Sequence, residues 1–291
     1  MPDLEKHRKI TIITACLNAE RTIEQTLRSV LDQNYPNLEY IIVDGGSTDG
    51  TLGVIDNYRD RLALVISEPD EGIYDAFNKG LRRATGELIG ILNADDFYAP
   101  WALESVKSAY MAHPESDVYF GRVVVLRDEE WLLYRQTGSP DDLTKRMSVP
   151  HPAIFLPRST YERRGLFDTS YKITGDWDYI LGLYMSGASF CRIDVPLTAF
   201  RQSGASSRLS RRHMAENRRV FLKYLSGVCA ARSIIKMYLK YIGRRFLRIT
   251  GIYNLYASYR DREIFSVESR GEYHDAESMW NSARGRDSLH K

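Results

Sequence analysis

The residues best suited to chemistry are Asn93, Asp95 and Asp96, which directly follow a short apolar run. That run, residues 88–92, is entered from Gly86 and predicts a buried strand. Ligands of open α/β sheets bind outside the carboxyl ends of the strands, where these side chains stand. Two adjacent carboxylates repel each other unless a cation or water screens them, and Mg²⁺ or Mn²⁺ is the usual cation near a diphosphate. For Asp95 and Asp96 alone, a solvated turn is the alternative.

Two further aspartates stand where a ligand is expected. Asp44 follows the apolar run 38–43 and precedes two glycines, which allow a flat ring to come close. Its carboxylate could accept a hydrogen bond from the ring N–H of a base such as uracil, or it could cap a helix expected to start near Thr48. Asp176 opens a predicted helix, where the helix dipole stabilises a carboxylate. Capping of that helix would explain its position equally well.

The elements that position these residues alternate along the chain. Four apolar runs predict buried strands, at residues 10–16, 38–43, 63–67 and 88–92. Segments with helical spacing lie between them, so we expect a mainly parallel sheet flanked by helices, an α/β fold. No G-x-G-x-x-G follows the first strand, which argues against a dinucleotide-binding domain. Further on, the patterns predict a helix at 100–111, antiparallel strands at 118–126 and 131–134, and a mobile loop at 137–147.

Four stretches resemble, in order and spacing, the family 2 glycosyltransferases: ITIITACLNAERTIEQTLRSVLDQ, IIVDGGSTDGT, SEPDEGIYDAFNKGLRRATGE and LNADD. A later stretch, FDTSYKITGDWDYIL, resembles the segment that carries the catalytic base of that family. The similarity extends over about residues 8–205. It implies a Rossmann-like GT-A fold and the transfer of a sugar, with inversion, from a nucleotide-diphosphate sugar. UDP is the expected nucleotide, and hexosyl or N-acetylhexosaminyl transfer the expected reaction.

The resemblance also assigns roles to single residues. Asp176 matches the catalytic base, and Asp95 matches the ligand of a divalent metal, Mg²⁺ or Mn²⁺. Nucleotide contacts are implied for Thr14, Ala15, Asn18, Glu20, Asp44, Asp70, Asn78, Asn93 and Ala94. Contacts to the donor sugar or the acceptor are implied for Asp96, His151, Trp177 and Arg201. Glu20 could instead be only an acid in the first turn of a helix, and a lone histidine such as His151 is often structural.

The chain departs from the family pattern at three places. The family usually has an acid at the position of Asn93 and a glutamate at that of Gly175. An amide keeps an oxygen acceptor but loses the charge. Some relatives have a histidine as third metal ligand near the position of Ser203. Two alternatives therefore remain: a membrane-bound nucleotide-sugar binding module with a weak site, and a nucleotidyltransferase, which should have a Gly-rich basic loop after the first strand.

Charge is unevenly distributed along the chain. Residues 208–262 hold 14 Lys and Arg against two acids, hence +12, and the rest carries −10 because the whole chain is +2. Apolar residues there recur at steps of four and three and predict an amphipathic helix with a basic flank, interrupted near Gly243 and Gly251: Ile235, Leu239, Ile242, Phe246, Ile249, Tyr253 and Tyr256. An anionic membrane surface is the favoured partner. Docking of this stripe on the catalytic domain and a homodimer seam are the alternatives, and no nucleic-acid partner is expected.

The expected organisation is a catalytic domain at 1–207, a basic helical extension at 208–262 and a flexible tail at 263–291. The charged start of the chain and the absence of an apolar stretch of 18 residues predict a cytoplasmic protein held peripherally on the inner face of the cell membrane. Three scattered cysteines fit a reducing compartment. The resemblance implies a glycan or lipid-linked acceptor in the synthesis of bacterial surface polysaccharides.

Overall fold

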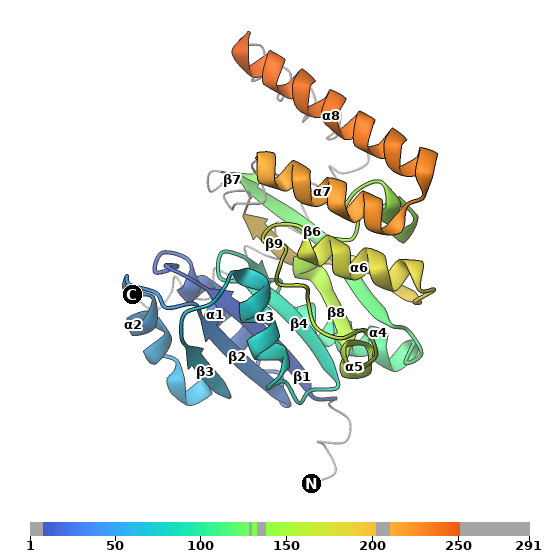
Figure 1. The fold of residues 1–291 in the computed structure, drawn as a ribbon. Helices are drawn as coiled ribbons and strands as arrows, with labels where there is room; N and C mark the ends of the chain where they lie inside the picture. Colours follow the sequence, from blue (N-terminus) through green and yellow to red (C-terminus); the bar gives the residue numbers. More distant parts are fainter. Residues whose placement is uncertain (1–7, 128–129, 133–137, 202–209, 251–291) are drawn as a thin grey trace.

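The computed structural model describes residues 8–127, 130–132, 138–201 and 210–250 and shows one mixed sheet flanked by helices (Figure 1). Within these residues nine strands form the sheet, in the order β3-β2-β1-β4-β8-β6-β9-β5, and β7 pairs with β6. The predicted α/β class is confirmed. Ser203, Tyr253, Tyr256 and the tail from residue 263 lie outside the described residues.

The first half of the sheet is parallel, as the alternation of apolar runs and helices predicts. β1 pairs in parallel with β2 and β4, and β2 with β3. The predicted strands are confirmed to within one residue: β1 (Ile10–Cys16), β2 (Leu38–Asp44), β3 (Leu64–Ser67) and β4 (Leu88–Asn93). Between them lie α1 (Ile23–Leu31), α2 (Thr51–Asp56), the 3-10 turn η2 (Arg59–Arg61) and α3 (Ile73–Leu81).

The second half of the sheet is mixed, and it continues from β4 through the antiparallel strand β8. The expected antiparallel pair of β6 and β7 is confirmed. The strands are β5 (Phe97–Tyr98), β6 (Val118–Arg127), β7 (Glu130–Leu132), β8 (Ile154–Pro157) and β9 (Phe190–Arg201). The helices and 3-10 turns are α4 (Ala102–Ala112), η3 (Pro140–Thr144), η4 (His151–Ala153), α5 (Arg158–Arg164) and α6 (Gly175–Met185).

Two large apolar cores, one on each face of the sheet, explain why the central strands are mostly apolar. Along β1, Ile13 and Ala15 pack into the core that contains α3 and α6, whereas Ile10 and Ile12 pack into the core that contains α1 and α4. Successive side chains of a strand point to opposite faces, so a strand covered on both faces has no solvent-facing position to give to a polar residue. The carboxyl ends of these strands are therefore fixed rigidly.

The segment expected to be a mobile loop, residues 137–147, is anchored instead. It contains η3, and the side chain of Leu143 is fully buried in the core that also holds α6. The indole N–H of Trp177 donates to the Leu143 carbonyl at 2.8 Å. The apolar residues Leu143 and Met147 in a mostly polar stretch were the sequence signal for this anchoring, and the prediction of a mobile loop missed it.

Two helices follow the sheet, α7 (Arg211–Tyr224) and α8 (Gly227–Ile249). α7 lies along α6, and α8 lies beyond α7 at the top of the molecule (Figure 1). The predicted helical extension is confirmed, but the expected interruption near Gly243 is wrong, because α8 continues through that residue. The break lies instead between α7 and α8, where Gly227 has a φ of 39°. Among the described residues, no helix is both long and apolar enough to cross a membrane.

Candidate active site

The carboxyl ends of the four parallel strands meet at one edge of the sheet. The strand register places Ala15 beside Asn93 and Cys16 beside Asp44, and it places Asp44 beside Ser67. The polar residues that follow these strands are therefore brought together, as the sequence pattern predicts. This edge is the position at which α/β sheets bind ligands.

Asp44 organises the loop after β2. Its carboxylate is buried and accepts hydrogen bonds from the Ser47 N–H at 3.1 Å, the Gly46 N–H at 3.2 Å and the Ser67 hydroxyl at 2.8 Å. Burial alone would raise the pKa of Asp44, but these hydrogen bonds lower it. The alternative of helix capping by Asp44 is wrong, because α2 begins only at Thr51. Recognition of the nucleotide base by Asp44 stays a prediction. It requires the Asp44 carboxylate to accept hydrogen bonds both from this loop and from the base.

Asp70 lies against the same loop. Its carboxylate accepts the Gly72 N–H at 2.8 Å, and a Cβ atom added to Gly45 would come within 2.3 Å of its Oδ2. A side chain at position 45 would have to displace the Asp70 carboxylate, so glycine there favours the close contact of the loops after β2 and β3. Two of the residues expected to contact the nucleotide, Asp44 and Asp70, thus belong to adjoining loops.

The loop after β1 contacts the loop after β2. Asn18 is exposed, has a φ of 50°, and accepts the Thr48 N–H on its side-chain oxygen at 2.9 Å. Glu20 is exposed and accepts the Gly50 N–H at 3.2 Å. Glu20 lies in a turn before α1, so the alternative of an acid in the first turn of that helix is wrong. Both side chains hold the loops after β1 and β2 together at the surface.

Three residues expected to contact the nucleotide direct their polar groups inward. The Thr14 side chain is fully buried and its hydroxyl lies 3.0 Å from that of Tyr40. Asn78 is 2% exposed, and its amide both donates to and accepts from the backbone of Phe167 at 2.9 Å. Ala94 is buried, and its carbonyl accepts the Thr26 hydroxyl. These contacts give the three residues structural roles. Ala15 is also buried, at the end of β1.

Asn93, Asp95 and Asp96 form a buried oxygen-rich corner at the end of β4. Asp96 is fully buried and accepts the backbone N–H of Arg201 at 3.1 Å, whereas Asp95 is partly exposed. Burial raises the pKa of both carboxyls, and for Asp96 the neighbouring charge of Asp95 adds to the effect. The side-chain oxygen of Asn93 is buried without a hydrogen-bond partner. The charge of Arg201 only partly offsets the effect of burial, so a bound cation would further stabilise the corner.

A divalent metal fits this corner. Mg²⁺ and Mn²⁺ prefer oxygen ligands, and Asp95 with the open oxygen of Asn93 offers two, supported by Asp96. In the described part of the chain no group of three His, Cys, Asp or Glu side chains is present, so further ligands would have to be water or diphosphate oxygens. The predicted position of a third protein ligand, Ser203, lies outside the described residues.

Arg201 lies beside this corner. Its guanidinium donates to the Asp95 carbonyl at 3.0 Å and to the side chain of Gln25, and it lies 5.5 Å from the centre of the Phe97 ring. The prediction placed Arg201 near the diphosphate of the donor. Its position next to Asp95 and Asp96 is consistent with that role, which stays a prediction.

Asp176 is partly exposed in the first turn of α6 and contacts α3 through Tyr74. The Tyr74 hydroxyl donates to its carboxylate at 3.1 Å. A Cβ atom on Gly175 would come within 2.8 Å of the Tyr74 ring, so a larger residue at position 175 has no room. Position 175, where the family usually has a glutamate, is therefore a glycine at the place where the Tyr74 ring fills the space. Sequence reasoning missed Tyr74, although a tyrosine in a buried helix face needs a partner for its hydroxyl.

The two remaining predicted contacts differ in their exposure. His151 is half-buried and stacks on Phe77 at 5.4 Å; burial lowers its pKa, and the charge of Asp176 opposes that effect. His151 thus lies near Asp176 and stays available for a substrate contact. Trp177 is 4% exposed, bonds Leu143 and meets Phe221 edge-on, so its predicted contact with substrate is not supported.

Known proteins resemble this chain in sequence and in fold. Residues 11–171 match the family described as Glycosyl transferase family 2. The PGL/p-HBAD biosynthesis glycosyltransferase of Mycobacterium bovis is 29% identical over 204 residues, which cover 68% of this chain and 78% of that protein. The putative teichuronic acid biosynthesis glycosyltransferase TuaG of Bacillus subtilis is 41% identical over 98 residues, 33% of this chain and 39% of TuaG.

Two solved structures share the fold. Residues 1–349 of S. aureus TarS in complex with UDP-GlcNAc give a TM-score of 0.61 at 18% identity, covering 77% of this chain and 69% of that one. The match to the longer TarS structure covers 43% of that chain. The mannosyltransferase PcManGT of Pyrobaculum calidifontis, in complex with GDP-Man and Mn²⁺, gives 0.55 at 18% identity, covering 98% of this chain and 88% of that one.

Proposed function

Because this chain belongs to glycosyl transferase family 2, we propose that it moves a hexosyl or N-acetylhexosaminyl group from a UDP-sugar to a glycan or lipid-linked acceptor with inversion. Its fold is that of the GT-A glycosyltransferases, and it is a glycosyltransferase. The observation that carries the proposal is the placement of Asp176, held by Tyr74 at the sheet edge that also carries Asp95 and Asp96.

The proposed mechanism is a single displacement. Asp176 accepts the proton of the acceptor hydroxyl as that oxygen attacks the anomeric carbon, and Tyr74 orients its carboxylate. A metal bound by Asp95 and Asn93 would neutralise the charge that grows on the leaving diphosphate. One base that acts on one face of the sugar gives inversion, whereas a retaining route through a glycosyl-enzyme needs two carboxyl groups flanking the bond. His151, which is half-buried, is proposed to contact the donor sugar or the acceptor.

The nucleotide is proposed to bind across the loops after β1, β2 and β3. Asp70 and Asn18 offer polar side chains there, and Asp44 lies behind them. The solved complexes of TarS with UDP and of PcManGT with GDP-Man support a nucleotide-linked ligand, but the two ligands differ in their base. The choice of UDP rests on Asp44 as the acceptor of a uracil N–H.

A panel of nucleotide sugars tests the proposed function. With Mn²⁺ and water as acceptor, we expect slow release of UDP from a UDP-hexose or UDP-N-acetylhexosamine and none from GDP- or dTDP-linked sugars. Release of pyrophosphate from a nucleoside triphosphate and a sugar 1-phosphate would indicate a nucleotidyltransferase instead. Binding without release of UDP from any donor, with lipid-linked acceptors also present, would favour a binding module.

The outward face of α8 supports the proposed location at a membrane. α8 packs against the rest of the protein through Ala230, Ile234 and Met237. Four apolar residues on another side, here called the outer stripe, are between 59% and 65% exposed: Ile235, Leu239, Ile242 and Phe246. α8 therefore does pack on the rest of the protein, as the alternative of docking on the catalytic domain expected, but not through the outer stripe. Apolar groups exposed in this number mark an interaction surface.

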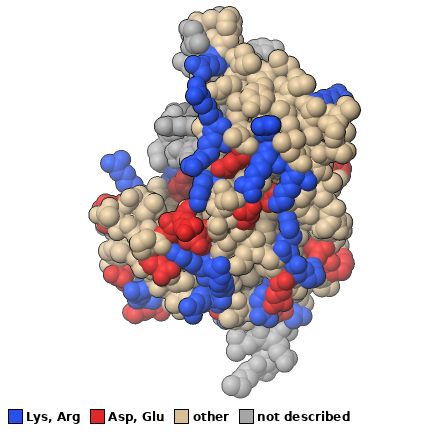
Figure 2. Space-filling model, in the orientation of Figure 1, with Lys and Arg blue, Asp and Glu red and all other residues tan. Residues whose placement is uncertain are grey.

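The charged residues next to the outer stripe indicate which kind of partner surface it binds. Arg232, Lys236 and Lys240 are exposed and recur every four residues along α8. Figure 2 shows lysine and arginine side chains extending over the region of α7 and α8, beside a broad uncharged surface. A helix that combines an apolar stripe with a basic flank binds in the plane of an anionic membrane, where each basic residue contributes about 1 kcal/mol. We therefore place the protein peripherally on the cytoplasmic face of the cell membrane, near a lipid-linked acceptor.

Liposome flotation checks this location. The protein is expected to float with anionic liposomes at low salt, less at high salt because the attraction is screened, and to stay unbound with neutral liposomes. Exchange of Lys236, Lys240, Arg244 and Arg248 for glutamine should abolish flotation and leave donor binding intact. The matched control removes four exposed arginines of the catalytic domain, Arg59, Arg83, Arg158 and Arg192, and should still float. An intact protein that ignores anionic liposomes but sediments as a dimer would make the outer stripe a dimer seam.

A further inference from the structure

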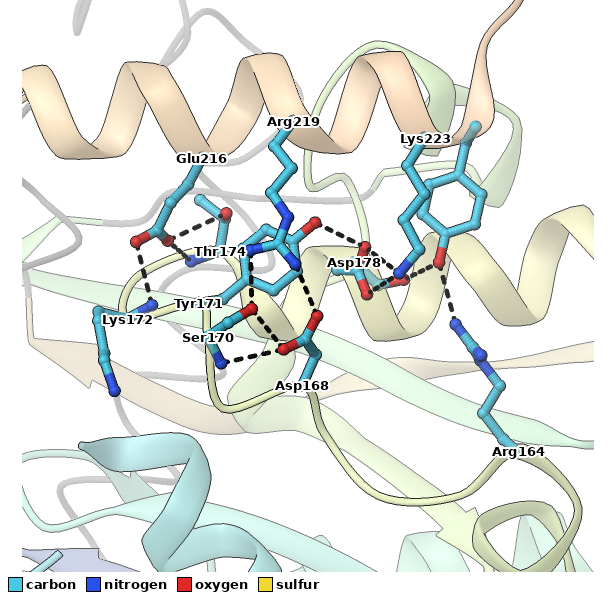
Figure 3. Close-up of polar contacts among 11 residues, drawn as sticks. Arg164, Asp168, Ser170, Tyr171, Lys172, Thr174, Asp178, Glu216, Arg219 and Lys223 are labelled. Carbon is cyan, nitrogen blue, oxygen red and sulfur yellow. Dashed lines mark hydrogen bonds and ion pairs between the residues drawn. The ribbon is translucent and has the colours of Figure 1, made fainter. Parts of the chain in front are cut away.

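α7 holds the segment from which the candidate base projects, residues 168–178, here called the base segment. Figure 3 shows side chains of α7 reaching it, among them Glu216, Arg219 and Lys223. Arg219 donates to Asp168 at 2.9 Å and to the Ser170 hydroxyl at 2.7 Å, and its guanidinium lies 4.1 Å from the centre of the Tyr171 ring. Lys223 contacts both carboxylate oxygens of Asp178 at 2.8 Å. Glu216 contacts the residues that directly precede α6.

Glu216 binds three consecutive backbone N–H groups just before α6. Its carboxylate accepts from Lys172 at 3.0 Å, from Ile173 at 2.9 Å and from Thr174 at 3.0 Å, and the Thr174 hydroxyl adds a fourth contact at 3.3 Å. Glu216 is only 8% exposed, although it is one of just two acids among residues 208–262. A buried carboxylate is tolerated when several donors satisfy it, and each such charge-assisted hydrogen bond is strong.

This arrangement replaces the usual capping of α6. Thr174 is the N-cap residue of α6, but its side chain does not bond the first turn, because its hydroxyl is directed to Glu216. The Asp176 carboxylate in that first turn accepts the Tyr74 hydroxyl at 3.1 Å. The first turn of a helix frays unless its free N–H groups find partners. Asp176 is therefore fixed from one side by α3 and from the other by α7.

We infer that Glu216 is a positioning residue for Asp176. By binding the backbone of residues 172–174, it sets where α6 begins and so where the Asp176 carboxylate meets the Tyr74 hydroxyl. α7 then belongs to the catalytic unit, although a boundary near residue 207 was expected to separate them. This inference rests on the proposed role of Asp176 as base. Displacement of a reacting group by about 1 Å can cost on the order of 10²-fold in rate.

Glu216→Gln tests the inference, because it keeps the size of the side chain and removes one acceptor oxygen. The new amide N–H₂ faces backbone N–H groups, so the backbone of residues 172–174 has to move. With the UDP-sugar that turns over in the panel above, we expect kcat to fall about 10- to 100-fold. The affinity for UDP and Mn²⁺ should stay within twofold, because Glu216 lies on the α7 side of Asp176. Hydrogen exchange of the amides of residues 172–174 should accelerate.

Val220→Ala is the matched control for stability. Val220 is fully buried in α7 but does not contact the base segment through hydrogen bonds, so its truncation lowers the melting temperature through lost packing. At a temperature at which both variants are folded, Val220→Ala should keep the wild-type kcat and Glu216→Gln should not. Equal kcat values for the two variants, or a Glu216→Gln variant within twofold of wild type, would overturn the inference.

Two more variants keep the test decisive. If Glu216→Gln does not fold, Thr174→Val removes one of the four donors and should lower kcat about two- to fivefold at unchanged nucleotide affinity; a wild-type kcat would contradict the inference. Asp176→Asn separates the two claims. If that variant is inactive while Glu216→Gln is fully active, only the positioning role fails. If Asp176→Asn itself is fully active, the proposed base fails and the positioning role fails with it.

Discussion

Asp176→Asn is expected to lower the turnover of glycosyl transfer by about 10²–10⁴-fold, the usual contribution of a general base. The amide has the size of the carboxylate and can still accept the Tyr74 hydroxyl, so α6 should keep its place. What the variant loses is the ability to take the proton of the acceptor. The measurement is the turnover number with saturating donor, and the melting temperature should change little.

Asp60→Asn serves as the control for this first prediction, since Asp60 is an exposed aspartate in η2 with no predicted part in the reaction. It should keep wild-type turnover. If Asp176→Asn also keeps it, Asp176 is only an acid in the first turn of α6, and the base has to be sought elsewhere.

Removal of the divalent metal is expected to stop the reaction. EDTA should abolish turnover, and Mg²⁺ or Mn²⁺ should restore it. Asp95→Asn should lose about 10²-fold or more even with metal present, because stabilisation of a leaving oxygen by a metal contributes several kcal/mol. The physical reason is the oxygen-rich corner at the end of β4, where burial raises the pKa of both carboxyls and the side-chain oxygen of Asn93 has no hydrogen-bond partner.

The melting temperatures of Asp95→Asn and Asp96→Asn are expected to differ. Asp96 is fully buried and holds the backbone of Arg201, so Asp96→Asn should lower the melting temperature, whereas Asp95→Asn should leave it almost unchanged. Turnover that persists in EDTA would remove the metal from the mechanism and leave Arg201 as the cation nearest to the corner.

The parallel half of the fold could be predicted from sequence because its central strands are mostly apolar on both faces. β2 ends in Asp44 and β4 in Asn93, and the lengths of the strands follow from the apolar runs themselves. The same pattern predicted which residues would meet at the sheet edge, since parallel strands place their carboxyl ends together.

Contacts between distant segments could not be predicted in this way. Tyr74 meets Asp176 across 102 residues of sequence, and Glu216 meets Thr174 across 42, so no local pattern encodes either pair. For the same reason the buried positions of Asn78 and Trp177 were missed. A motif shows that a residue matters, but it does not show whether the side chain faces a ligand or the core.

The amphipathic pattern of α8 was predicted, but its orientation was not. Periodicity identified the outer stripe without showing whether it faces the protein, and Ile234 and Met237 turned out to form the packed face. A helix with apolar residues on two sides gives one stripe to the core and leaves the other for a partner.

The central claim is a division of labour: Asp176 acts on the acceptor and Asp95 acts on the diphosphate through a metal. Calorimetric titration with UDP, with and without Mn²⁺, tests it most directly for the wild type, Asp176→Asn and Asp95→Asn. The account predicts that Asp176→Asn binds UDP like the wild type in both conditions, and that Asp95→Asn binds UDP with Mn²⁺ only as well as the wild type does without it. A Mn²⁺-dependent gain that survives in Asp95→Asn, or disappears in Asp176→Asn, would contradict the account.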